Sequence, residues 1–449
     1  MRSAIRTGLL SLSAALFISG PLFAQSDLDQ RINKEGDSLL ATYKHIHEHP
    51  ELSTQEKETS ALLAAELRKA GYEVTDHFGQ YDDPSLISYG IVAVLKNGPG
   101  PVVYVRTDMD ALPIVENTGL PYASHVKVKR AGGAEVGVMH ACGHDLHMTV
   151  FLGTARMLVQ LKDHWSGTVV LIGQPAEETV GGAQAMLRAG LFKKFPKPDY
   201  VLALHDTSAV PAGKVSWHAG PLLAGADSVD ITVRGYGGHG AAPQVTKDPI
   251  VIASEIVVML QTIVSREMDP QLPTVVTVGS FHAGTKNNII PDEARLQLTV
   301  RTMNPEQREK VLADIARITN GVAAAAGVPS ERAPIIQVEE DHVPATINDP
   351  ALSRRVGASL ERALGKDNVL AGEPIMASED FSLFALADPK PSICMFWLGA
   401  ADAAKLKAAM EKGTRLPGPH SSEFAPVPGP AIHTGVKAMT SAVMDLLQK

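Results

Sequence analysis

The sequence has few cysteines and aromatic residues, and it lacks the motifs of several protein classes. Only 2 of its 449 residues are cysteine, aromatic residues make up 5%, and the formal net charge is −8. It has no basic block and no basic stripe interleaved with aromatics, so we expect no nucleic-acid partner. It also lacks a G-x-S-x-G elbow and an H-E-x-x-H helix, which argues against a serine hydrolase and a zincin. With no internal repeat or low-complexity tract, its length predicts two or three ordinary globular domains.

The first 24 residues read as a targeting segment. Two arginines precede an apolar run from Gly8 to Ile18, and the small residue Ala24 follows. This order is typical of a secretory signal peptide. The run is too short for a membrane span, which needs about 20 residues. We therefore predict a signal peptide over residues 1–24, cut after Ala24, a periplasmic or secreted location, and no membrane span.

The two cysteines lie in different surroundings. Cys394 is in the apolar stretch "SICMFWLG", where a buried core thiol is expected. Cys142 is in "HACGHDLHMT", among three histidines and an aspartate. A metal or catalytic role explains the neighbours of Cys142 better than a disulfide between the two cysteines, although that disulfide stays open at this point.

Continuous apolar runs alternate with helical patterns along much of the chain. Short, continuously apolar runs at 89–98, 101–110, 167–178 and 199–206 are separated by helical patterns. Such runs predict buried, mostly parallel strands covered by helices on both faces. In the segment 53–74, Ser53 with Glu56 three residues later predicts a helix cap, and Gly71 predicts the helix end.

The hydrophobic pattern changes in the middle of the chain. The stretches "ADSVDITVRG" and "DEARLQLTVRT" alternate apolar and polar residues, as half-exposed antiparallel strands do. Long helical patterns accompany them. We predict an α/β catalytic domain, with a mostly parallel central sheet flanked by helices, over residues 25–221 and 341–449. An α+β domain is inserted into it over residues 222–340.

Three of the apolar runs end in residues that bind metals. One ends in Asp108 and Asp110, the next in the pair Glu177–Glu178, and the third in His205. In open α/β sheets, sites form beyond the carboxyl ends of the strands, so these side chains could face one crevice. The turn with Cys142 and His144 would join them there, and His420 in a late Pro/Gly-rich loop is a candidate for a final ligand.

Sulfur, nitrogen and oxygen donors together suit Zn²⁺, with Mn²⁺ or Co²⁺ as alternatives. The donors outnumber the needs of one tetrahedral ion, which indicates two metals. Of Glu177 and Glu178, one is expected to act as the general base and the other as a metal ligand. His45, His47 and His49 are expected to have a structural or supporting role. The stretch "GYGGHG" fits a dinucleotide fingerprint but follows an alternating strand, so no nucleotide site is predicted.

From about Tyr43 onward the sequence resembles the M20 metallopeptidase family, in its amidohydrolase branch. That branch includes hippurate hydrolases, N-acyl-amino-acid amidohydrolases and auxin-conjugate hydrolases. The stretches that carry the resemblance are "HEHPELSTQE", "VRTDMDALPIVENTGLPYAS", "HACGHDLHMT", "GQPAEET", "ALHD", "GYGGHGAAP", "KDPI", "GTKNNIIPDEARLQLTVRT" and "ASEDFS".

The resemblance implies roles for individual residues of the catalytic domain. Glu177 matches the general base, and Asp110 matches an aspartate that supports the metal site. The implied metal ligands are Cys142, His144, Glu178, His205 and His420. Around His420 the chain departs from the family pattern, since "HSSEFAPVPGP" stands where an acidic tract is common.

The inserted domain resembles the family's lid, which often also forms the dimer. His239 matches a histidine that stabilises the oxyanion, sometimes across the dimer. Asn288 and Arg301 match residues that grip the substrate carboxylate, with Asn287 as a weaker alternative. In this scheme His140, Asp145 and His147 are supporting or packing residues.

The expected function is metal-dependent hydrolysis of the amide bond in N-acyl amino acids or similar conjugates. A metal-activated water would attack, with Glu177 as base. Two alternatives stay open: a carboxypeptidase or dipeptidase that cleaves short peptides, and a family member that binds conjugates or metal without catalysis. The expected partners are a small-molecule substrate and, through the inserted domain, a second copy of the chain.

Overall fold

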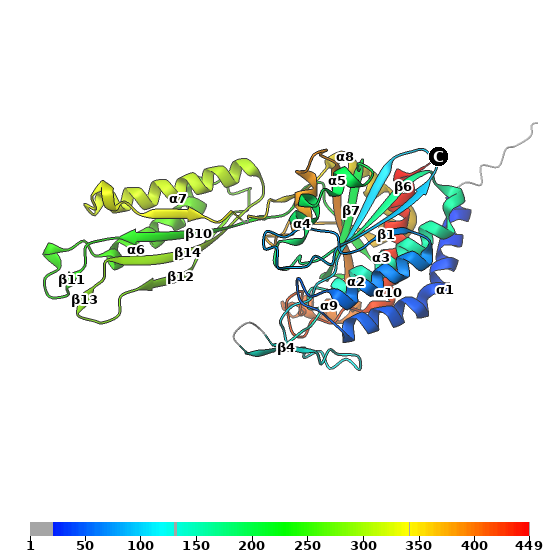
Figure 1. Cartoon of the computed structure of the whole chain (residues 1–449), viewed down its shortest axis with the longest axis horizontal. Coiled ribbons are helices and arrows are strands. Elements are labelled where there is room, and N and C mark those ends of the chain that lie inside the picture. Colours follow the sequence, from blue (N-terminus) through cyan, green and yellow to red (C-terminus); the bar gives the residue numbers. More distant parts are fainter. Residues whose placement is uncertain (1–20, 130–132, 341, 449) are drawn as a thin grey trace, which may run out of the picture.

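The computed structural model describes residues 21–129, 133–340 and 342–448. The chain forms a large globular body and an elongated second lobe that extends from it (Figure 1). Most of the predicted signal peptide lies outside the described residues.

The large body is built on an eight-stranded sheet in the order β1-β2-β6-β3-β7-β18-β8-β17. The four central strands, β6, β3, β7 and β18, run parallel to one another, which confirms the predicted mostly parallel sheet. The strand bounds are β1 Glu73–Thr75, β2 Ile91–Asn97, β3 Val102–Asp108, β6 Gly167–Gln174, β7 Tyr200–Pro211, β8 Val215–Trp217, β17 Val369–Ala371 and β18 Ser392–Ala401.

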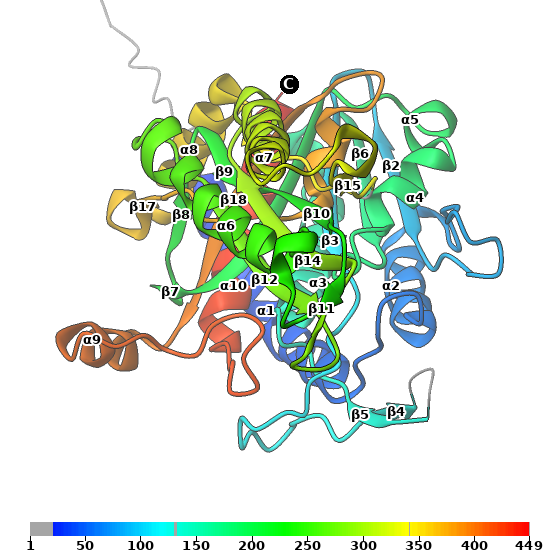
Figure 2. The same cartoon turned by 90° about the vertical axis from the view of Figure 1, so that its left-hand side faces the viewer.

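Helices cover both faces of this sheet. One face carries α1 (Pro21–Glu48), α2 (Lys57–Ala70), α3 (His144–Gln160), α8 (Pro350–Leu364) and α10 (Pro428–Leu446) over the larger hydrophobic core. The other face carries α4 (Gly182–Arg188), α5 (Leu191–Lys194) and the 3-10 helix Asp380–Ala385 over a smaller core. The remaining helix, α9 (Ala403–Glu411), stands away from the body (Figure 2).

The predicted start of α2 is wrong. The helix begins at Lys57, and Glu56 occupies the cap position without a side-chain capping bond. The two side chains are engaged elsewhere and therefore do not form a capping box: Ser53 bonds to a distant carboxylate, and Glu56 accepts from one distant backbone nitrogen and from that of Thr54 nearby. Gly71 ends the helix as predicted, in the left-handed conformation at φ 98°.

The second lobe is a four-stranded antiparallel sheet in the order β12-β14-β10-β15. Its strands are β10 (Gly225–Arg234), β12 (Val275–Ala283), β14 (Glu293–Thr302) and β15 (Ile335–Val338). Apolar residues of β10 and β14 alternate toward one face, where they form a separate core with α6 (Pro249–Thr262) and α7 (Pro305–Ala325). Each fully buried aliphatic side chain there contributes roughly 1.5–3 kcal/mol. The opposite face is polar, as the alternation predicts.

A short pair of strands lies at each end of this lobe. At its outer end, β11 (Gly238–His239) pairs with β13 (Ile289–Ile290), far from the large body (Figure 1). At the inner end, β9 (Gly220–Leu223) pairs with β16 (Thr346–Asn348), where the chain leaves the body and returns to it. The lobe is therefore an insertion between two parts of one α/β domain.

Helix α6 continues into a π-helical turn, Ile263–Glu267. Within the described residues, the stretch Pro249–Glu267 is the one helix whose length and composition would suit a membrane span. It packs against β10, β12 and β14 on one side.

Candidate metal centre and active site

The parallel strands β6, β3 and β7 are neighbours, so their carboxyl ends lie at one edge of the sheet. Asp108 ends β3, the pair Glu177–Glu178 follows β6, and His205 lies in β7. Helix α3 begins at His144 at the same edge, directly after Cys142 and Gly143. The strand ends thus meet as expected from the sheet topology.

Five residues with metal-binding donors come together at this edge. Cys142 Sγ lies 3.5 Å from His205 Nε2, and His420 Nε2 lies 3.4 Å from Glu178 Oε2. His144 Nε2 lies 3.9 Å from Glu178 Oε1. Cys142, His144 and His205 form one group with donors within 4.8 Å of one another, and Cys142, Glu178 and His420 form a second.

The chemistry of these donors fits divalent metal ions. His144 Nε2 and Glu178 Oε1 are buried and have no hydrogen-bond partner among the described residues, although buried polar atoms are normally paired. The other ring nitrogen of His144 donates to the backbone oxygen of Asp110 at 2.7 Å, an arrangement that orients a metal-binding imidazole. Two donor groups that share Cys142 offer places for two ions.

Burial also makes the negative charges of the site costly. It raises the pKa of the Cys142 thiol and of the Glu177 carboxyl well above their usual values, and that of Glu178 to about 7. The carboxylates of Glu379 and Glu178 add to the effect on Glu177. Divalent cations bound between these side chains would offset this repulsion and favour the thiolate and carboxylate forms.

The turn that carries Glu177 and Glu178 is held by two carboxylates from elsewhere in the chain. The Asp110 side chain accepts hydrogen bonds from the backbone nitrogens of Glu177 (3.1 Å) and Glu178 (3.0 Å). Glu56 Oε1 accepts one from the preceding backbone nitrogen, that of Ala176, at 2.8 Å. Ser53 Oγ completes the set by donating to Asp110 Oδ2 at 2.6 Å. Ala176 has a positive φ of 50°, so the turn depends on these three successive bonds.

A buried ion-pair cluster lies behind the donors. The guanidinium of Arg106 is fully buried and contacts Asp108 Oδ2 (2.8 Å), Glu379 Oε1 (2.8 Å) and Asp380 Oδ1 (3.0 Å). On its other side Asp108 accepts from His147 Nδ1 at 2.8 Å. The sequence analysis missed Arg106 and gave no role to Glu379 or Asp380, although an arginine inside an apolar strand is a signal for such a pair.

Of the histidines expected to support the site, His47, His140 and His147 lie around the start of α3, whereas His45 and His49 are exposed near the end of α1. His47 is buried and its Nδ1 lies 2.6 Å from Asp145 Oδ2, which is next to His144. His147 contacts Asp206 as well as Asp108, and both ring nitrogens of His140 are buried without a partner among the described residues. Both cysteines are free, so the disulfide left open by the sequence does not form in this structure.

A pocket of about 630 Å³ opens over the donors. Cys142, Glu177, Glu178, His205 and His420 line it on the catalytic side. Arg301, at the inner end of β14, reaches it from the lid and donates to Ser378 Oγ at 2.7 Å. The pocket therefore joins candidate metal ligands, a candidate base and a cationic side chain.

The other two lid residues from the sequence analysis are not brought to this pocket. His239 lies in β11 and Asn288 directly precedes β13, both at the outer end of the lobe (Figure 1). The backbone nitrogen of Gly240 donates to the Asn288 oxygen at 2.9 Å, so the two predicted residues are close to each other. Within a single chain, Arg301 is the predicted lid residue that reaches the site.

Comparisons with known proteins agree with this geometry. Residues 104–412 match the model of "Peptidase family M20/M25/M40". A "Thermostable carboxypeptidase 1" from Saccharolobus solfataricus is 38% identical over 86% of this chain and 90% of its own length. A "Hippurate hydrolase" from Campylobacter jejuni is 40% identical over 76% of this chain and 82% of its own.

Solved structures show the same architecture. A putative aminohydrolase from methicillin-resistant Staphylococcus aureus has a TM-score of 0.81 at 32% identity, covering 94% of this chain and all of that one. The YXEP protein of Bacillus subtilis, described as a dinuclear metal-binding peptidase, has a TM-score of 0.74 at 29% identity, covering 92% of this chain and 99% of its own.

Proposed function

Because the chain belongs to peptidase family M20/M25/M40, in its amidohydrolase branch, and is a metal-dependent amide hydrolase, we propose that it releases a free amino acid from N-acyl amino acids or similar conjugates. The observation that carries this proposal is the shared pocket. Glu177 and the donor cluster form one wall, and Arg301 offers a guanidinium from the lid. An arginine fork suits a substrate carboxylate.

The chain's own residues supply the steps of the reaction. Divalent ions held by Cys142, His144, Glu178, His205 and His420 would supply Lewis acidity to the amide carbonyl and to a water molecule. Glu177 takes the proton from the attacking water and delivers it to the nitrogen of the leaving amine. Asp110 fixes Glu177 through the backbone, and Arg301 orients the substrate.

We propose two ions per chain, Zn²⁺ or Mn²⁺, with Co²⁺ as a further alternative. The support is the mixed set of sulfur, nitrogen and oxygen donors in two groups. The relative described as dinuclear supports the number. Elemental analysis of the purified protein would test both number and identity, and a stoichiometry of one metal would contradict the pair.

Cleavage of short peptides from their carboxyl end is the second candidate. The similarity to a thermostable carboxypeptidase favours it, and the same groups would perform the same chemistry. A panel of N-acyl amino acids and dipeptides separates the two, because the ratio of kcat/KM values identifies the preferred class.

The decisive variant is Glu177→Gln. It removes the proton acceptor while leaving the proposed ligands in place, so turnover of a hippurate-like substrate should be abolished while metal content stays near that of the wild type. Retained activity would refute the role of Glu177. If the wild-type protein, loaded with metal, hydrolyses dipeptides but no conjugate, the proposed substrate class is wrong.

We propose that the lid also forms a homodimer. Apolar side chains of Val251, Val258, Met259 and Val264 are exposed on and just after α6, and a patch of this kind is typical of an interface. Strand β12 lies at an edge of its sheet, which adds a free row of backbone groups. A partner lid would also offer a way for His239 to reach a catalytic centre.

Subunit complementation tests this dimer. A mixture of His239→Ala and Glu177→Gln chains should recover activity if His239 acts in the partner's site, whereas each variant alone is inactive. Val258→Glu, on the exposed face, should shift the mass measured by light scattering from dimer to monomer. A wild-type monomer would contradict the proposal.

We propose further that the chain is exported. The support is the arginine-flanked apolar segment before Ala24. Mass spectrometry of protein from the periplasmic or secreted fraction should find a mature N-terminus at Gln25, and an intact Met1 there would contradict it.

A further inference from the structure

Arg301 is a half-buried cation without a carboxylate partner. Its guanidinium lines the 630 Å³ pocket, and within the described residues its one hydrogen bond goes from Nη1 to Ser378 Oγ, at 2.7 Å. Burial alone lowers the pKa of the Arg301 guanidinium, since no nearby carboxylate acts in the opposite direction. Arg106, by contrast, contacts three carboxylates. Buried charges are normally paired, so the unpaired guanidinium of Arg301 indicates an anionic ligand.

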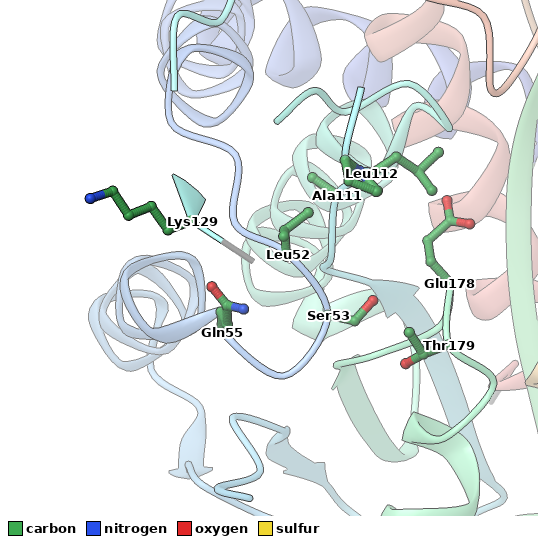
Figure 3. Close-up of a pocket in the computed structure, with 9 residues that line it drawn as sticks. Leu52, Ser53, Gln55, Ala111, Leu112, Lys129, Glu178 and Thr179 are labelled. Carbon is green, nitrogen blue, oxygen red and sulfur yellow. The ribbon is translucent and has the colours of Figure 1, made fainter. Parts of the chain in front are cut away.

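A smaller hollow beside the same donors offers no comparable cation. Its volume is about 430 Å³, and Glu178 lines both it and the larger pocket. Its one lysine, Lys129, extends the ammonium group away from the other lining residues (Figure 3). Of the two hollows, the larger one is therefore the one in which a cationic side chain can meet the anionic end of a substrate.

Ser378, the partner of Arg301, lies on a segment that is fixed to the hinge of the lid. The Ile375 nitrogen donates to the Leu222 oxygen at 3.0 Å, and the Ile375 oxygen accepts from the Ala224 nitrogen at 3.2 Å. Leu222 belongs to β9, where the chain leaves the catalytic body. The start of the segment therefore follows the position of this strand.

The residue after Ser378 is held from two further directions. Glu379 Oε1 accepts from the buried Arg106 at 2.8 Å, and the Glu379 backbone oxygen accepts from Thr346 Oγ1 at 3.4 Å. Thr346 begins β16, by which the chain returns from the lid. The backbone at Ser378 is thus tied to both hinge strands and to the buried ion-pair cluster, which gives its hydroxyl a defined place opposite Arg301.

A serine suits this position because its hydroxyl oxygen accepts a hydrogen bond without cancelling the charge of the arginine. A guanidinium has five N–H donors in one plane, and the bond to Ser378 uses one of them. The bond restrains the long side chain and leaves an edge of the guanidinium free. Such an edge can bind both oxygens of a carboxylate.

We propose that Ser378 is a positioning residue for substrate recognition: its hydroxyl oxygen holds the Arg301 guanidinium in the larger pocket, with the free N–H groups available to the carboxylate of the amino-acid part. This inference rests on the proposed function, in which Arg301 binds that carboxylate. It adds that a segment of the catalytic body, fixed to the hinge, sets the orientation of a lid side chain.

The test compares an N-acyl amino acid with its C-terminal carboxamide on the metal-loaded full chain. The wild type should prefer the carboxylate in kcat/KM. In Ser378→Ala the KM for the carboxylate should rise about tenfold, the scale of one hydrogen bond to a charged group, with kcat within about twofold of the wild type. The KM of the carboxamide, or its inhibition constant if turnover is too slow, should change by less than about twofold, because it has no anion for Arg301. A purely structural role would raise both values equally.

A double-mutant cycle identifies Arg301 as the group through which Ser378 acts. Arg301→Met should remove the preference for the carboxylate. Adding Ser378→Ala to it should change the preference by less than about twofold, because no guanidinium is left for the hydroxyl to hold. Ser378→Thr, which keeps a hydroxyl, should retain the wild-type preference.

Ser382→Ala is the matched control. It removes a hydroxyl from the 3-10 helix that follows the segment, and that hydroxyl donates to the Glu379 oxygen at 3.1 Å instead of contacting Arg301. The preference should stay within about twofold of the wild type, the range for an independent site.

Equal changes for both substrates in Ser378→Ala, additive losses in the double variant, or the same loss in Ser382→Ala would overturn the inference. An unchanged preference in Arg301→Met would also overturn it. A wild type that hydrolyses no N-acyl amino acid would instead refute the proposed function.

Discussion

Replacing Glu56 by alanine should damage the active site from a distance, because its carboxylate holds the backbone that presents Glu177. Glu56 is fully buried, and its Oε1 accepts from the backbone nitrogens of Ala176 at 2.8 Å and Thr54 at 2.9 Å. In Glu56→Ala both donors lose their acceptor. Ala176 is fully buried, so its nitrogen meets the full cost of an unmade bond, while Thr54 is partly exposed and can bond to water.

The magnitude follows from these two bonds. An unsatisfied buried donor costs about 1–3 kcal/mol, and a bond replaced by water costs about 0.5–1.5 kcal/mol. From these two bonds the free energy of unfolding should fall by about 1.5–4.5 kcal/mol. The protein should remain folded, since domains have about 5–15 kcal/mol to lose. Release of the left-handed Ala176 would also move Glu177, and a displacement of about 1 Å costs about 100-fold in kcat.

Glu56→Gln is the matched control. Its amide oxygen can accept the same two hydrogen bonds, and it removes a buried carboxyl whose pKa is raised to about 8 by burial and by the nearby Asp110. Its stability should stay within about 1 kcal/mol of the wild type, the range of one hydrogen bond. Urea unfolding and kcat below the unfolding transition are the measurements. Equal losses in both variants, or an alanine variant as active as the wild type, would refute the proposed support of the turn.

Three further outcomes are expected. Arg106→Met should lower the free energy of unfolding by about 3–5 kcal/mol in denaturant titrations, since it leaves Asp108 and Glu379 buried without their cation; a change under 1 kcal/mol would contradict the ion-pair cluster. Gly143→Ala should cost about 1–2 kcal/mol for the left-handed backbone at φ 78°. It should also reduce metal content, because the new Cβ would collide with the Asp206 carboxylate; unchanged metal content would argue against that contact. Removing metal with a chelator should lower the Tm and abolish activity, and both should return on adding Zn²⁺ or Mn²⁺, since a ligand bound only to the folded state stabilises it.

The sequence by itself determined the two kinds of sheet. A strand that is apolar throughout must be buried on both faces, as the central parallel strands are. A strand in which apolar and polar residues alternate must have one face exposed to solvent, as β10 and β14 do. The same runs carried the candidate ligands, because parallel strands place their carboxyl ends at one edge. Asp108, Glu178 and His205 could be predicted to meet before any coordinate was known.

Only the tertiary structure decided which partners the remaining polar residues take. Glu56 fits a local capping box by sequence, yet it bonds to Ala176, 120 residues away. Arg106 pairs with Glu379 across 273 residues. The same holds for the distance of His239 from the pocket. Periodicity reports which face of an element is buried. The partners of a buried charge depend on which segments pack together, and that is settled by the packing of the whole chain.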